Sequence, residues 1–63
     1  MTHETESVLR QIIIHFLELE EAENNTAKQF AAKQNYSSAF VSSARSSAFY
    51  TAANEIEKFI KKG

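Results

Sequence analysis

The sequence predicts an all-α fold, a helical hairpin of two long helices in a single helical domain spanning residues 1–63. The chain has no Pro, and Gly63 is its only Gly; these are the two residues that most disfavour a helix interior. There is no Cys, and therefore neither a disulfide nor a thiolate metal site. A chain this short buries only about 60% of the surface that its unfolded form exposes, so we expect self-association to add stability.

The first helix is expected to begin near Thr2 to Thr5, where a hydroxyl can cap it and Glu4 and Glu6 suit its positive end. Its apolar residues, with the exception of Ile14, cover an arc of about 180° on a helical wheel. They are Val8, Leu9, Ile12, Ile13, Phe16, Leu17 and Leu19. One neighbouring helix would need a narrower arc, so the pattern predicts contact with at least two helices, as in a dimeric four-helix-type bundle.

The pattern leaves the end of the first helix open. In one alternative the helix runs to about Gln34, and residues 35–37 form the only turn. In the other it breaks near residues 24–26, at Asn24 and Asn25, and a short helix starts at Thr26. Thr26 and Gln29 have the spacing of a capping box, which favours the break. The glutamates of residues 18–23 are unfavourable near a helix C-terminus, which favours continuation.

The last helix should start at Ser37 or Ser38 and reach about Lys61, because Lys58, Lys61 and Lys62 suit its negative end. On a helical wheel its alanines form a packing seam and most of its serines form the rim. The predicted core and dimer residues of both helices are Leu9, Ile12, Ile13, Phe16, Leu19, Phe30, Val41, Ala44, Ala48, Ala52, Ile56, Phe59 and Ile60. A turn near Tyr36 would set Phe16 beside Ile56.

Residues 26–45 also resemble a helix-turn-helix motif, which is the alternative functional interpretation. Phe30-Ala31 is followed four residues later by Asn35, a residue that tolerates a left-handed backbone. In this interpretation the second helix of the motif would lie in the major groove of DNA. The candidate DNA-binding residues are then Lys28, Lys33, Ser37, Ser38, Ser42 and Arg45. Against it, Arg45 is the only basic residue near the presumed recognition face, although such faces normally carry several.

Neither a metal site nor a catalytic site is expected. His15 and Glu18 have the spacing of half a metal site, but the only other histidine, His3, lies at the expected frayed end. The chain has no Asp and no strand-turn-helix elbow for a serine nucleophile. The sequence therefore predicts a protein that is not an enzyme and binds no cofactor.

Charge divides the chain into two halves. Residues 1–23 carry a net charge of −5 and residues 24–63 carry +4, which suits an antiparallel arrangement. No apolar run approaches the length of about 18 residues that a membrane span needs, so we expect a cytoplasmic location.

The expected function is that of a small regulatory protein, a homodimeric helical module that binds another protein. Its contact surface is predicted to be either the serine rim with Tyr50 (Ser42, Ser43, Ser46, Ser47) or the acidic patch (Glu18, Glu20, Glu21, Glu23).

Overall fold

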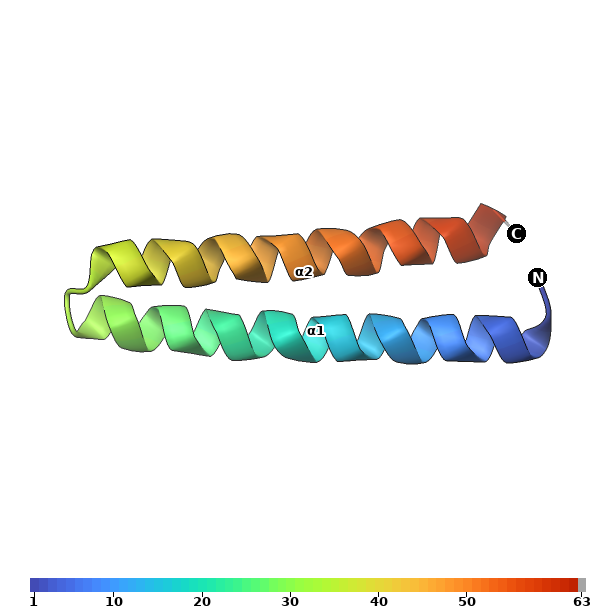
Figure 1. Ribbon diagram of the computed structural model, residues 1–63, viewed down its shortest axis with the longest axis horizontal. Coiled ribbons are helices and arrows are strands. Elements are labelled where there is room, and N and C mark those ends of the chain that lie inside the picture. The colour runs from blue at the N-terminus through green and yellow to red at the C-terminus, as the bar shows by residue number, and fades with distance from the viewer. Residues whose placement is uncertain (63) are drawn as a thin grey trace.

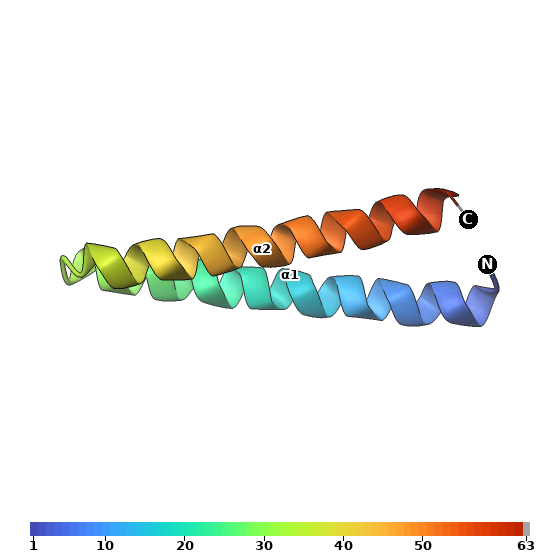
Figure 2. The same cartoon turned by 45° about the horizontal axis from the view of Figure 1, so that its top comes forward.

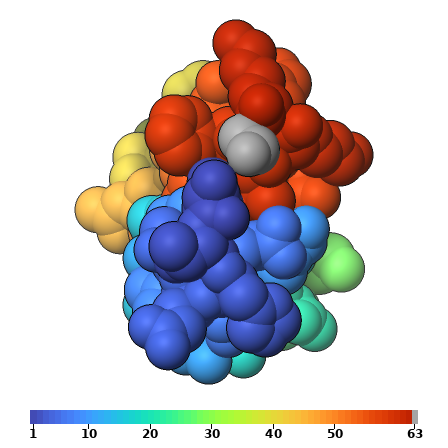
Figure 3. All heavy atoms as spheres, turned by 90° about the vertical axis from the view of Figure 1, so that its right-hand side faces the viewer, coloured from blue at the N-terminus to red at the C-terminus, as the bar shows by residue number. Residues whose placement is uncertain are grey.

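The computed structural model describes residues 1–62, which form two antiparallel α-helices joined by a short turn (Figure 1). Helix α1 spans His3–Ala32 and helix α2 spans Tyr36–Lys62. The hairpin is 48 Å long, close to the about 45 Å expected of a straight 30-residue helix. Seen from its open end in Figure 3, the first residues of α1 and the last residues of α2 lie side by side. The prediction of an all-α hairpin is confirmed.

Helix α1 starts where the sequence predicts. Thr2 is its N-cap, and the Thr2 hydroxyl oxygen accepts a hydrogen bond from the backbone N–H of Thr5 at 3.1 Å. Glu4 and Glu6 occupy the first turn, where the helix dipole favours negative charge.

Of the two alternatives for the first helix, the break near residues 24–26 is not the one found, because α1 continues through Asn24 and Asn25 without interruption. Thr26 does not cap a new helix. Its hydroxyl donates instead to the carbonyl oxygen of Ala22 at 3.0 Å, the bond to the preceding turn that Thr makes inside helices. The alternative of one long first helix is the correct one.

The turn lies at residues 33–35 rather than the predicted residues 35–37. Asn35 N–H donates to the Phe30 carbonyl at 2.8 Å and Gln34 N–H donates to the Ala31 carbonyl at 2.9 Å, which is a Schellman motif. The left-handed residue is Gln34, with φ 61°, and not Asn35. Asn35 is the cap of α2 instead, because its Oδ1 accepts from Ser38 N–H at 3.3 Å. With this cap, α2 starts at Tyr36, one residue before the predicted start.

The two helices meet along a seam whose residues alternate spacings of three and four, the pattern of an antiparallel coiled coil. Each seam residue is buried or half-buried. In α1 they are Leu9, Ile13, Phe16, Glu20, Glu23, Ala27 and Phe30; in α2 they are Ala39, Ser42, Ser46, Phe49, Ala53, Ile56 and Ile60. In α2 most of the large seam side chains lie toward the C-terminus and the small ones lie near the turn. Correspondingly, the ribbons in Figure 2 draw apart toward the open end.

The predicted alanine seam of α2 is wrong in the middle of the helix. Ala44 and Ala48 are exposed, whereas Ser42 and Ser46 are buried, each with 3% of its surface exposed. The reason lies in α1, where Glu20 and Glu23 occupy seam positions. Ser46 donates to the Glu20 backbone carbonyl at 3.2 Å, and Arg45 reaches Glu23 at 4.0 Å. Small hydroxyl side chains thus fit between the helices where long glutamate stems cross the seam.

The pairing of the helices is shifted from the predicted register, so that each residue of α1 lies opposite an earlier residue of α2 than expected. The ring of Phe16 stacks on Phe49, with 6.1 Å between centroids and 23° between planes, instead of lying beside Ile56. Arg10 pairs with Glu57 at 3.4 Å across the same two helices. The turn accounts for part of this shift, because it comes two residues earlier in the chain than predicted and an antiparallel partner moves by twice that displacement.

Candidate interaction surfaces

An antiparallel hairpin has two sides flanking its seam, and both carry exposed apolar residues here. We call the first the groove side; its apolar residues are Val8, Ile12, Leu19, Ala48, Ala52 and Phe59. We call the second the tyrosine side; it carries Leu17 and Tyr50, with Ile14 and Phe40 farther out. Residues seven apart lie on one side of a helix, so the Arg10–Glu57 pair extends the tyrosine side toward the open end.

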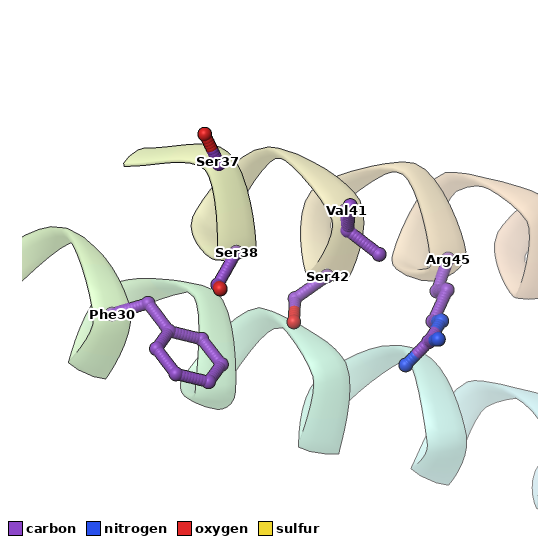
Figure 4. Close-up of a pocket in the computed structure, with 6 residues that line it drawn as sticks. All are labelled: Phe30, Ser37, Ser38, Val41, Ser42 and Arg45. Atoms are coloured by element: carbon purple, nitrogen blue, oxygen red, sulfur yellow. The ribbon is translucent and has the colours of Figure 1, made fainter. Parts of the chain in front are cut away.

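The groove side is hollowed next to the turn. An open groove of about 350 Å³ is lined by Phe30, Ser37, Ser38, Val41, Ser42 and Arg45, and we call it the turn groove. Figure 4 shows the Phe30 ring on α1 at its base, with Ser38 and Ser42 pointing toward α1 and Ser37 pointing away. The groove exists because the neighbouring seam residues are small, which leaves one face of the Phe30 ring uncovered.

The opposite end of the groove side carries exposed apolar side chains. Val8 and Phe59 have 56% and 65% of their surface exposed, and Ile12 is also exposed. We call these three residues the apolar knob. Phe59 lies on the same line of α2 as Ser38 and Arg45, since the three are separated by multiples of seven residues. One side of the hairpin therefore has a groove near the turn and a cluster of exposed apolar side chains near the termini.

The predicted serine rim is only partly a surface. Ser43, Ser47 and Tyr50 are exposed on the tyrosine side, whereas Ser42 and Ser46 belong to the seam between the helices. Ser46 is bonded to the Glu20 carbonyl between the helices, and Ser42 keeps only 3% of its surface exposed at the turn groove, so neither is a rim residue and this part of the prediction is corrected. What the sequence interpretation missed is Leu17, which is exposed beside Tyr50; their pairing follows only from the helix register.

The predicted acidic patch is divided in the same way. Glu18 and Glu21 are exposed on the outer face of α1, whereas Glu20 and Glu23 are half-buried against α2. The four carboxylates therefore do not form one continuous face.

The candidate DNA-binding residues are divided, since Ser37, Ser38, Ser42 and Arg45 line the turn groove and Lys28 does not. Lys28 lines a shallow hollow with Ala39 and Ser43 on the tyrosine side, whereas Arg45 lines the turn groove. Ser42 is buried against α1. A helix-turn-helix crosses its helices at about 90–120°, but within residues 1–62 the two helices run antiparallel with no shorter helix between them.

His15 is exposed, with its ring centroid 6.4 Å from that of Phe16. Within residues 1–62, no cluster of three or more potential metal-binding side chains occurs. In the same part of the chain, neither helix combines the length and the apolar content needed to cross a bilayer.

Comparison of the chain with protein-family models, curated proteins and solved structures finds no match. The accessible surface of the hairpin is 4779 Å², against about 4,100 Å² expected for a compact monomer of its mass. Its radius of gyration is 14.6 Å, against about 11 Å expected. A single hairpin is thus more extended and more exposed than a typical folded monomer.

Proposed function

We propose that the chain is a non-enzymatic interaction module of regulatory type, which works as a homodimeric four-helix bundle and presents a helical surface to another protein. The observation that carries the proposal is the apolar surface left exposed on both sides of the seam. Among residues 1–62, the buried apolar residues are only Ala27, Ala53 and Ile60. Two hairpins packed side by side bury what one hairpin leaves in water.

A dimer of this kind would use one side of each hairpin and leave the other side free. Leu17 and Tyr50, with 39% and 50% of their surface exposed, then form an apolar centre flanked by Ser43 and Ser47. An exposed tyrosine at the centre of such a surface supports a partner site, because aromatic side chains are enriched in protein interfaces and among their hot spots.

Sedimentation equilibrium tests the dimer. We expect twice the mass of the 7.1 kDa chain at micromolar concentration, and a monomer at all concentrations would contradict the proposal.

Salt-dependent retention on a DNA column tests the alternative function, DNA binding. A protein of net charge −1 with dispersed basic residues should pass through, whereas retention that falls steeply with salt would favour DNA binding.

The protein partner is tested with a photo-crosslinking amino acid placed at Tyr50 in the source cells. We expect one dominant adduct with another protein, and we expect Leu17→Glu to abolish it while the dimer persists. The matched control places the same amino acid at Ala44, which is exposed on the outer face of α2. Equal adducts from both positions, or adducts insensitive to Leu17→Glu, would contradict a partner site on the tyrosine side.

A further inference from the structure

We propose that the two copies of the dimer pack antiparallel through their groove sides, so that the apolar knob of each copy fills the turn groove of the other. This inference rests on the proposed homodimer and names its interface. A two-fold axis makes such a contact twice at once, because a surface that carries a protrusion and a matching hollow is self-complementary.

The positions of knob and groove agree with one two-fold axis. Val41 in the groove and Phe59 in the knob lie nine residues on either side of residue 50 in α2. A two-fold axis at the level of residue 50 brings the Phe59 of each copy to the turn groove of the other copy. Within one copy, Phe59 and Val41 of the turn groove are about 27 Å apart along the helix. On the groove side this level is flanked by Ala48 and Ala52, small residues that let the two copies approach closely at the axis.

The charges of the groove side favour the same arrangement. Arg45 and Glu55 lie five residues on either side of residue 50, so an antiparallel dimer brings the guanidinium of one copy to the level of the carboxylate of the other. A parallel dimer would instead bring Arg45 to the level of the other copy's Arg45 and Phe59 to the level of the other copy's Phe59, and it would leave both turn grooves empty. Like charges at one level of an interface are unfavourable.

The area available is what a stable dimer requires. The hairpin exposes roughly 700 Å² more than expected for a compact monomer of its mass. A standard protein interface buries about 800 Å² per partner. The groove side, with its protruding aromatic and its uncovered Phe30 ring, supplies the apolar centre that such an interface needs.

Disulfide trapping tests the arrangement, because the chain has no cysteine of its own. Mixing the Phe59→Cys and Val41→Cys variants under mild air oxidation should give a cross-linked dimer containing one of each. Phe59→Cys alone should give little cross-linked product. Rapid cross-linking between two copies of the Phe59→Cys variant would overturn the proposal in favour of a parallel dimer. Efficient cross-linking between two copies of a Tyr50→Cys variant would overturn it in favour of a dimer interface on the tyrosine side.

Sedimentation of alanine variants separates this proposal from the more general one. Phe59→Ala should raise the dimer dissociation constant about 30-fold or more, since it removes two apolar anchors per dimer. The matched control Phe40→Ala, on the other side of α2, should change it less than about threefold. A dimer that is weakened by Phe40→Ala and not by Phe59→Ala would overturn the interface while leaving the homodimer intact. A wild-type chain that stays monomeric would overturn both.

Discussion

Replacing Phe16 with Ala should destabilise the hairpin far more than replacing Phe40 with Ala, although the two changes remove the same atoms. Phe16 is half-buried in the seam and stacks on Phe49, whereas Phe40 has 76% of its surface exposed. Truncating a fully buried Phe costs about 3–5 kcal/mol. For a half-buried ring that also loses an aromatic partner, we expect a loss of about 2–3 kcal/mol.

This loss is large for a chain of 63 residues, whose total free energy of unfolding is expected to be about 3–9 kcal/mol. It should lower the melting temperature by roughly 10–20 °C. Phe40→Ala should change the free energy of unfolding by less than about 0.5 kcal/mol.

The assay is urea unfolding followed by far-ultraviolet circular dichroism, with wild type and both variants at one protein concentration, since dimerisation makes stability concentration-dependent. Equal losses in the two variants, or a larger loss for Phe40→Ala, would refute the seam described here.

Two further pairs of variants and one single variant probe the seam, the turn and the start of α1 by the same unfolding assay. Ser46→Glu should cost at least about 2 kcal/mol because it forces a charge between the helices, whereas Ser47→Glu, on the surface, should be nearly neutral; similar effects would contradict the burial of Ser46. Gln34→Gly should stabilise by about 0.5–1 kcal/mol because glycine adopts the left-handed conformation without strain, and Asn35→Gly should not stabilise because it removes a helix cap; the opposite ranking would contradict the turn. Thr2→Ala should lower stability by about 0.5–1 kcal/mol through loss of the N-cap, and an unchanged midpoint would contradict that cap.

The sequence was sufficient to predict two long helices, their antiparallel pairing and the start of α1, because these depend on composition, periodicity and capping. It was not sufficient to locate the turn. The left-handed position falls on Gln34, a residue with no special preference for it, while the more suggestive Asn35 serves as a cap. The displacement of the turn accounts for part of the shift in register.

The seam was missed in its middle because polar residues occupy it. Glu20, Glu23, Ser42 and Ser46 look like surface residues by type, and only their alternating spacing of three and four residues relative to Phe16 and Phe49 indicates that they face the other helix. The partner surface was overestimated for the same reason, since Ser42 and Ser46 were counted as rim residues.

The most direct test of the hairpin is a nuclear Overhauser contact between the rings of Phe16 and Phe49. It should be recorded on a sample in which labelled and unlabelled chains are mixed, so that contacts within one chain are separated from contacts between chains. We predict a strong contact between these rings within one chain, and none between Phe16 and Ile56. A contact of Phe16 with Ile56, or one with Phe49 found only between chains, would contradict the register and with it the positions of the seam, the turn groove and the apolar knob.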